Sequence, residues 1–309
     1  MNRILVTGAS GFVGGAAIAG LAEAGHTIRA AIRTSARAEF PSCVEVVRHP
    51  DYCEGVDWRP LLEDCDAVIH AAGMGDTGRG MSAELYDRVN RSATAQLANE
   101  AAKAGIRRLV FVSSIRAQCG PAAGHNVTER DPPSPSDAYG RSKLAAEDAI
   151  RAAGVPFTIL RPVTLYGPGV KGNMGLILRV AASPWPLPIK RLGNRRSLLG
   201  IDNLIAAIAF ALSSPAAIGA TYGIADPGIA PRLSDVVATL RQARGHRPLL
   251  VSVPTYPIEL ALRLVHRADL WQRFGGDLRV DPAKLIGAGW QPLHDTLGGL
   301  AALAAAATP

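Results

Sequence analysis

Short apolar runs alternate with longer amphipathic stretches through the first half of the chain. Five apolar runs bounded by turn residues predict strands, at residues 4–6, 27–32, 44–47, 67–73 and 109–114. Three of the longer stretches have helical composition, at residues 12–24, 93–104 and 138–153. Strands that alternate with helices in this way predict an α/β fold, in which a parallel sheet carries helices on both faces.

The second half is punctuated by Gly and Pro and predicts longer loops. Its regular elements are expected to be a helix beginning at Asn173, strands at residues 198–201 and 220–224, and a C-terminal helix that includes residues 301–307. Asp202 and Asn203 are predicted to cap the helix that follows the first of these strands. We therefore expect a first domain at residues 1–165. A smaller, mixed lobe at residues 166–309 would return some strands and helices to it.

A glycine-rich turn joins the first predicted strand to the first predicted helix, with the sequence TGASGFVG. Gly8 allows a tight turn, Gly11 leaves room for a pyrophosphate, and Gly14 lets the helix pack closely on the sheet. The helix start offers N–H groups to phosphates. The residues expected to bind a dinucleotide here are Gly8, Ser10, Gly11, Phe12, Val13 and Gly14. An ordinary glycine-rich turn is the alternative, but its place between strand and helix favours a Rossmann-type, doubly wound sheet.

The end of the second predicted strand carries a cation where NAD sites usually carry a carboxylate. Ile32 occupies this position, Arg33 follows it, and Arg37 is close behind. A cation suits the 2′-phosphate of NADP, so NADP is favoured and NAD is the second choice. Solvated surface charges are the alternative interpretation of both arginines. Asp51, after the third strand, is expected to accept a hydrogen bond from the adenine amine.

The fourth predicted strand ends in small residues against which a cofactor can lie. These are Ala71, Ala72 and Gly73, and we expect them to border the dinucleotide. His70, just before them, has no partner in the sequence pattern. We interpret it as a structural histidine at the end of the strand and not as a catalytic base.

Tyr139 and Lys143 lie four residues apart on a predicted helix, so they project from one face. A nearby ammonium is expected to lower the pKa of the tyrosine, which then exchanges a proton with a substrate hydroxyl. Ser114 ends the fifth strand and is the first choice to hold the substrate oxygen, with Ser113 as the second choice. A solvated Tyr–Lys pair is the alternative, and the upstream glycine motif argues against it.

These motifs together resemble the extended short-chain dehydrogenase/reductase family. The resemblance covers residues 4–297 and rests on TGASGFVG, HAAG, VNRSAT, VFVSSIRA, YGRSK, LRPVTLYGPG and NRRSLLGIDN. It is strongest to the nucleotide-sugar branch, the NAD-dependent epimerase/dehydratases, which includes UDP-hexose 4-epimerases and 4-keto-sugar reductases. The resemblance implies Ser114, Tyr139 and Lys143 as the catalytic residues. It also implies that Pro162 and Val163 contact the nicotinamide and that Asn90 lies near the active site.

The substrate half of the resemblance is less complete. It implies that Arg196 grips the diphosphate of a nucleotide sugar and that Asn173 contacts the diphosphate or the base, whereas a surface arginine is the alternative for Arg196. The second arginine of such a clamp has its nearest candidate in Arg273. The pair Ile115-Arg116 stands where 4,6-dehydratases carry Asp-Glu, which argues against that activity.

Composition narrows the remaining classes of function. The formal net charge is +7, and scattered basic residues without aromatic partners suit an anionic cofactor and substrate better than nucleic acid. The four cysteines and seven histidines show no ligand spacing, so we expect no metal, free thiols and a cytoplasmic location. The sequence also predicts no membrane association. Alanine-rich helices at residues 93–104 and 138–153 favour a homodimer by resemblance, although they can equally pack on their own sheet.

Three functional hypotheses follow from these features. The first is hydride transfer at C4 of a nucleotide-activated hexose, by a 4-epimerase or a 4-keto-sugar reductase of surface-polysaccharide sugar synthesis. The second is an NADPH-dependent reductase of a non-sugar ketone, for which Arg196 and Asn173 would have no role. The third is a non-catalytic NADP-binding sensor, which would not need the three residues Ser114, Tyr139 and Lys143.

Overall fold

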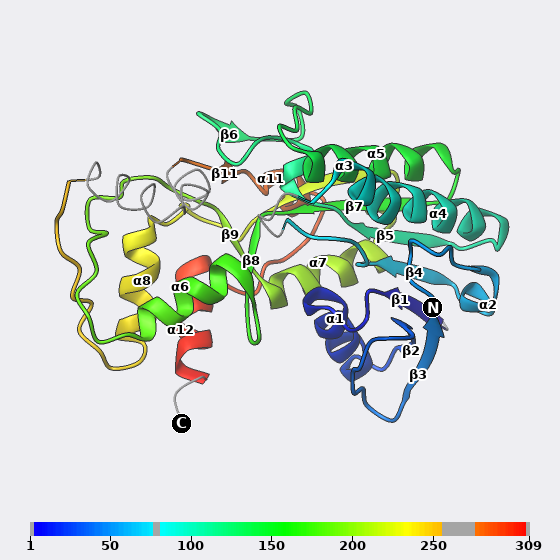
Figure 1. Cartoon of the computed structure of the whole chain (residues 1–309), viewed down its shortest axis with the longest axis horizontal. Coiled ribbons are helices and arrows are strands. Elements are labelled where there is room, and N and C mark those ends of the chain that lie inside the picture. The colour runs from blue at the N-terminus through cyan, green and yellow to red at the C-terminus, as the bar shows by residue number, and fades with distance from the viewer. Residues whose placement is uncertain (1–2, 77–80, 255–275, 307–309) are drawn as a thin grey trace.

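A seven-stranded parallel sheet forms the centre of the computed structural model, which describes residues 3–76, 81–254 and 276–306 (Figure 1). The strand order is β10-β7-β5-β4-β1-β2-β3. The strands are β1 Arg3–Thr7, β2 Thr27–Arg33, β3 Val44–His49, β4 Ala67–His70, β5 Arg108–Val112, β7 Phe157–Pro162 and β10 Ala220–Ile224. The order reverses direction between β1 and β4, so the predicted doubly wound Rossmann-type sheet is confirmed.

Two layers of helices cover this sheet (Figure 1). One layer contains α1 (Phe12–Glu23) and α7 (Ile201–Ser213), and the other contains α4 (Ala93–Lys103) and α5 (Ala138–Ala152). Side chains alternate between the layers along each strand: Ile4 packs in the α1 and α7 layer, whereas Leu5 packs in the α4 and α5 layer. Burial on both faces explains why these strands are continuously apolar in sequence.

The short helices and turns of the sheet domain complete these layers. They are α2 (Arg59–Leu62), α3 (Ala83–Tyr86), the π-helical turn η1 (Asp87–Ser92), and the 3₁₀ turns η2 (Ile115–Ala117) and η3 (Pro215–Ala217). The chain runs from α3 through η1 into α4 without a break. In the part of the chain that the structure describes, no helix has both the length and the apolar character needed to cross a bilayer.

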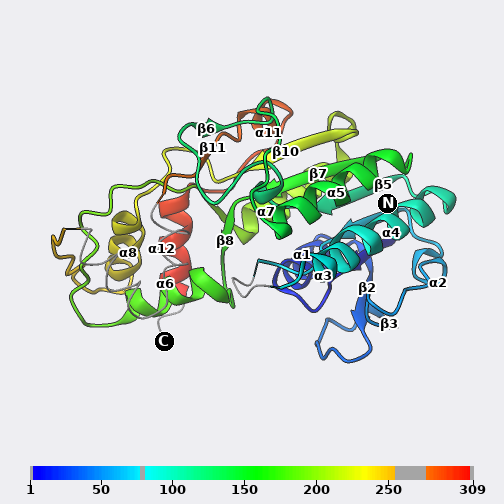
Figure 2. The ribbon, with the colours of Figure 1, turned by 45° about the horizontal axis from the view of Figure 1, so that its top comes forward.

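A smaller lobe lies beside the carboxyl ends of the strands (Figure 2). Its core lies among α6 (Gly172–Ala182), α8 (Leu233–Gln242) and α12 (Thr296–Ala306). The remaining elements are β8 (Thr164–Tyr166) paired with β9 (Leu198–Gly200), β6 (Asn126–Val127) paired with β11 (Arg279–Val280), and α11 (Ala283–Gly287). Although β10 and α7 come late in the chain, they belong to the layers of the large sheet. The division at residue 165 stays a prediction.

The predicted capping of α7 by Asp202 and Asn203 is wrong. The helix begins one residue earlier, after Gly200, and has no side-chain cap. Asn203 is fully buried, and its amide donates to Asp226 (2.7 Å) and to the His294 carbonyl (2.9 Å). The Asp202 carboxylate pairs with the His294 ring at 3.1 Å. Both side chains therefore join the helix to the C-terminal segment instead of closing its first turn.

A buried ion pair fixes α5 against the sheet. The Glu147 side chain is 0% exposed and accepts hydrogen bonds from two guanidinium nitrogens of Arg161 in β7, Nε at 2.9 Å and Nη2 at 2.6 Å. It also accepts from Ser113 Oγ (2.6 Å) and from Arg151 Nη2 (2.9 Å). One carboxylate thus joins the helix to β7 and to the residue that follows β5.

We predict that Glu147→Gln destabilises the fold by about 3 kcal/mol, because it leaves the Arg161 guanidinium buried without its counter-charge. Urea unfolding measures this loss. Asp148→Asn is the matched control, since that carboxylate pairs with Arg151 on the exposed side of the same helix and contributes under about 1 kcal/mol. Equal losses in the two variants would contradict the assignment.

Candidate active site

Two cavities meet at the carboxyl ends of the central strands. The first, about 460 Å³, lies between β5, β7, α5 and the smaller lobe, and the second, about 490 Å³, lies over β1, β2 and β3. Ala71, Gly73 and Met74 line both cavities, so the cavities are joined where the strand order reverses. A ligand crevice is expected at this point of a doubly wound sheet.

The glycine-rich turn lies between β1 and α1, and its geometry explains two of its glycines. Gly8 has a φ of +67°, and a Cβ there would come within 2.7 Å of the Ala72 Cα atom. A Cβ on Gly14 would collide with the Gly8 carbonyl oxygen, so this glycine lets α1 pack on the turn. Gly11 begins the helix without a side-chain cap, which leaves its first N–H groups to face the cavities. These features fit a dinucleotide pyrophosphate.

Part of the glycine-rich turn borders the cavities. Ser10 and Gly11 line the second cavity, and Val13 lines the first. Phe12 lines neither of them and instead borders a groove between α1 and α7. Its ring lies close to Gly167, where an added Cβ would come within 3.3 Å of it.

The second cavity holds Arg33 and Asp51 side by side. Their side chains form an ion pair at 3.1 Å and are 53% and 39% exposed. A hydrogen bond from the Cys53 backbone N–H and the pairing with Arg33 lower the pKa of Asp51. The sequence analysis assigns Arg33 and Asp51 to different parts of the cofactor, the 2′-phosphate and the adenine. In the structure the two side chains form an ion pair at the edge of the cavity.

His70 is a structural residue, in agreement with the sequence interpretation. It is buried between Thr7, whose hydroxyl lies 2.7 Å from Nδ1, and Thr94, whose hydroxyl lies 2.8 Å from Nε2. Thr94 donates its own proton to the Asn90 carbonyl (2.5 Å), so it accepts from the ring. Burial lowers the pKa of His70 to about 3, which keeps the ring neutral.

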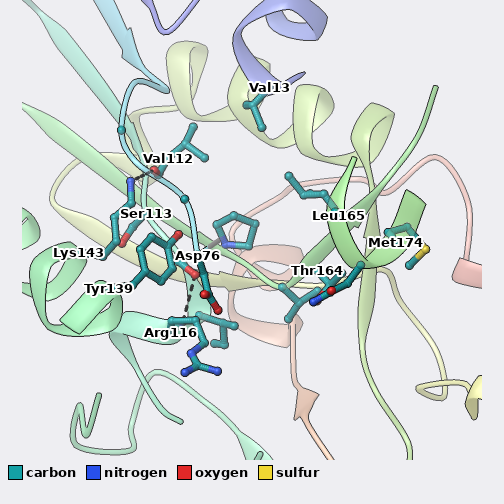
Figure 3. A pocket seen from close by; sticks show the side chains of 18 of the residues that line it. Val13, Asp76, Val112, Ser113, Arg116, Tyr139, Lys143, Thr164, Leu165 and Met174 are labelled. Atoms are coloured by element: carbon teal, nitrogen blue, oxygen red, sulfur yellow. Dashed lines mark hydrogen bonds between the residues drawn. The ribbon is translucent and has the colours of Figure 1, made fainter. Parts of the chain in front are cut away.

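Tyr139 and Ser114 both line the first cavity, and Tyr139 is labelled in Figure 3. Ser114 follows β5, and its hydroxyl accepts from the Arg116 backbone N–H at 3.2 Å. Tyr139 is the second residue of α5. Burial raises the pKa of Tyr139, while its hydrogen bond with the Ser114 side chain acts in the opposite direction. Burial is the largest of these effects, so the pKa of Tyr139 is raised overall, and its lowering by Lys143 together with a cationic nicotinamide stays a prediction.

Lys143 lies beside Tyr139 on the same wall of the pocket (Figure 3). The residue is 5% exposed, and its ammonium donates to the Val112 carbonyl at 3.2 Å and lies 4.8 Å from the centre of the Phe111 ring. Burial lowers the pKa of Lys143 to about 8, although the Glu147 carboxylate opposes this shift. A Cβ on Gly73 would lie 3.2 Å from the ammonium, so the glycine leaves space above it.

Ser113 and Asn90 support the walls of the pocket. Ser113 lies at the wall, but its hydroxyl donates to Glu147. The Asn90 amide donates to the Met74 carbonyl (3.1 Å) and to Ser142 (3.0 Å), while its oxygen accepts from the Met74 N–H (2.7 Å). Asn90 is 1% exposed and lies behind the described residues that line the pocket. Both side chains therefore make hydrogen bonds within the protein, and the contacts with substrate expected of Ser113 and Asn90 stay a prediction.

The opposite side of the first cavity comes from β7 and the smaller lobe. Pro162, Val163, Asn173 and Arg196 all line it. The Arg196 guanidinium donates to the Gly276 carbonyl (2.9 Å) and the Pro121 carbonyl (3.0 Å), which fixes its plane. Burial, with a smaller effect from Arg116, lowers the pKa of Arg196 to about 10, so it remains a cation at neutral pH.

The described lining of this cavity is positively charged overall. It contains Arg116, Lys143, Lys171 and Arg196 against Asp76. An excess of cations in a half-enclosed site attracts an anionic ligand. Arg273, the candidate for a second clamp, lies outside the described residues. Within those residues no group of three or more His, Cys, Asp or Glu side chains is placed to hold a metal ion.

The sequence interpretation did not identify Arg116, Lys171 and Asp137 as site residues. Arg116 and Lys171 line the cavity, and Asp137 caps α5 through a hydrogen bond from the Gly140 N–H (2.7 Å). The role of Asp137 can be predicted from sequence, since an aspartate directly before a helical stretch is a typical N-cap. The role of Arg116 cannot, because it depends on how the turn after β5 packs against the start of α5.

Comparison with known proteins agrees with this geometry. The model of the NAD dependent epimerase/dehydratase family matches residues 4–225. A UDP-glucose 4-epimerase of Vibrio cholerae is 30% identical over 302 residues, which cover 94% of this chain and 91% of that protein. A ceramide reductase of Caulobacter vibrioides is 29% identical over 273 residues, which cover 87% and 78%.

Solved structures show the same fold. The UDP-glucuronic acid 4-epimerase of Bacillus cereus, solved in complex with NAD, superposes with a TM-score of 0.77 at 21% identity. The superposition covers 98% of this chain and 95% of that one. The arrangement of sheet and smaller lobe is therefore shared over almost the whole length.

We predict that one lysine titrates with a pKa near 8, because the Lys143 ammonium is buried. The measurement is an NMR titration of protein labelled with ¹³C at lysine Cε, which is simple for a chain of five lysines. The resonance that titrates early disappears in Lys143→Met and remains in the control Lys103→Met. A set of lysines that all titrate near the usual value of about 10.4 would contradict the prediction.

Proposed function

The chain belongs to the NAD dependent epimerase/dehydratase family, and from this we propose that it transfers hydride at C4 of a nucleotide-activated hexose. It acts either as a 4-epimerase or as a 4-keto-sugar reductase. The observation that carries the proposal is the position of Ser114, Tyr139 and Lys143 on one wall of a pocket that joins the dinucleotide cavity. A binding protein without catalytic activity has no use for this arrangement.

Tyr139 is the group that moves the substrate proton. Its phenolate oxygen takes the proton when the sugar hydroxyl is oxidised, and the hydroxyl formed in that step returns the proton when the ketone is reduced. Ser114 holds the same substrate oxygen, and the Lys143 ammonium favours the phenolate while it also binds the nicotinamide ribose. The bound nicotinamide dinucleotide supplies or accepts the hydride. The buried wall keeps bulk water from the tyrosine.

The other wall of the pocket suits a nucleoside diphosphate. The Arg196 guanidinium and the Lys171 ammonium supply the charge, and Asn173 at the start of α6 supplies an amide. An apolar ketone would gain nothing from these groups, which disfavours a steroid or flavonoid reductase. A role in surface-polysaccharide sugar synthesis, in a cytoplasmic homodimer joined through α4 and α5, completes the proposal.

NADP is the favoured cofactor, with Arg33 beside its 2′-phosphate and Asp51 beside the adenine. The Arg33–Asp51 ion pair lies at the edge of the second cavity, where an adenosine ribose would lie. Because Asp51 already neutralises part of the Arg33 charge, the preference is expected to be moderate. The UDP-glucuronic acid 4-epimerase of Bacillus cereus was solved with NAD, which remains the second choice here.

Tyr139→Phe is expected to bind cofactor and fold as the wild type does while losing most turnover. Proton transfer by a positioned side chain contributes about 10²–10⁴-fold, and phenylalanine removes only the hydroxyl. Steady-state kinetics measure the loss, with Tyr222→Phe as the control because the Tyr222 hydroxyl donates to the Ala216 carbonyl at 3.2 Å and lines neither cavity. Near-normal turnover of Tyr139→Phe would refute the assignment.

Arg33→Ala is expected to reduce the preference for NADP over NAD by about 1.5 kcal/mol, the lower end for a charged hydrogen bond, because Arg33 is half exposed. Calorimetric titration of each cofactor measures the change. Asp51→Asn is the complementary variant and should increase the preference, since it frees the guanidinium. Equal affinity of the wild type for both cofactors would exclude the proposed role.

The two candidate reactions differ in how they use the cofactor. An epimerase oxidises and then reduces the same sugar, so purified protein should interconvert UDP-glucose and UDP-galactose without net use of nicotinamide. A reductase should oxidise one NADPH for each UDP-4-keto-hexose that it consumes. Steady interconversion without added cofactor excludes the obligate reductase, and stoichiometric loss of NADPH without interconversion excludes the epimerase.

A further inference from the structure

Arg116 lies between the two elements that carry the catalytic side chains. It is the middle residue of η2, the turn that follows Ser114, and its backbone N–H donates to the Ser114 hydroxyl at 3.2 Å. Its guanidinium pairs with the carboxylate of Asp137, which is the N-cap residue of α5. The same residue therefore contacts the end of β5 and the start of the helix that carries Tyr139.

The backbone of η2 also lies in direct contact with the backbone of α5. A Cβ on Gly140 would collide with the Arg116 carbonyl oxygen, so the first turn of α5 lies directly on η2. Asp137 uses its two carboxylate oxygens separately: Oδ1 accepts from the Gly140 N–H at 2.7 Å, and Oδ2 accepts from Arg116. The cap of the helix and the link to Arg116 are thus made by one side chain.

We propose that Arg116, acting through Asp137, is a positioning residue that holds the Tyr139 hydroxyl against Ser114; this inference rests on the proposed function. Tyr139 is only two residues past the cap, in the part of a helix where ends fray. A charge-assisted hydrogen bond at the cap restrains that turn more strongly than a neutral one. A displacement of the hydroxyl by about 1 Å would cost turnover about 100-fold.

Several charged and titratable groups face Tyr139, and they define the pH readout. Asp76 after β4 and Tyr86 of α3 raise the pKa of Tyr139, whereas Arg116 and the Ser114 hydrogen bond lower it. Lys143 approaches from α5 itself (Figure 3). Loss of the Arg116 charge therefore raises the pKa of Tyr139 further. When the enzyme oxidises the sugar hydroxyl, Tyr139 acts as the base, so the rise of activity with pH should occur at higher pH in the variant.

The test compares four variants of the 309-residue chain, with UDP-galactose or a UDP-4-keto-hexose and NADPH as substrates. Arg116→Gln removes the charge, and Arg116→Lys keeps it. Asp137→Ser keeps a good N-cap but removes the partner of Arg116. Arg59→Gln is the control, since it breaks an exposed ion pair with Asp57, next to α2 and outside the pocket.

We expect Arg116→Gln and Asp137→Ser to lower kcat about 10- to 100-fold with little change in KM, and Arg116→Gln to shift the pH profile upward. Arg116→Lys should restore most of kcat. Wild-type kcat in Arg116→Gln and Asp137→Ser, or equal losses in Arg116→Lys and Arg116→Gln, would overturn the proposal. Tyr139→Phe separates the proposed function from this inference. Normal turnover of Tyr139→Phe would contradict the proposed function. An inactive Tyr139→Phe together with a normal Arg116→Gln would contradict only this inference.

Discussion

The buried Glu147 carboxylate is the interaction on which the catalytic half of the molecule depends. Glu147 lies on α5, the helix that carries Tyr139 and Lys143. Its carboxylate accepts hydrogen bonds from Arg161 of β7 and from Ser113, which follows β5. A carboxylate without solvent is tolerated only when such partners surround it. Because the pair forms in only one relative placement of helix and sheet, it fixes the catalytic residues with respect to the cofactor cradle.

The second constraint is the reversal of strand order between β1 and β4. It opens the crevice in which the glycine-rich turn, the small residues after β4 and the pocket over β5 and β7 meet. Gly8 and Gly14 are required because backbone packs against backbone at this point. The smaller lobe then supplies the cationic wall. In the proposed function, the chemistry and the recognition of the nucleotide sugar thus come from different halves of the chain.

Most of the sheet could be predicted from sequence because its strands are buried on both faces and its turns carry glycine at fixed spacing. The proposed catalytic residues could be selected from sequence by their spacing, since Tyr139 and Lys143 share a helical face and Ser114 follows a strand. The roles of Ser113, Asn90 and Asp202 could not be predicted, because each bonds a residue more than 30 positions away. The rise in the pKa of Tyr139 could not be predicted from sequence spacing either, since burial depends on the folded pocket.

The central claim is that hydride moves at C4 while Tyr139 moves only an exchangeable proton. The most direct measurement is to run the reaction in D₂O, with UDP-galactose or with a UDP-4-keto-hexose and NADPH, and to examine the sugar by NMR. Hydride transfer between carbon centres does not exchange with solvent, so C4 should carry protium in the product. Deuterium at C4 would contradict the account, because it would show that C4 takes a proton from solvent instead of a hydride.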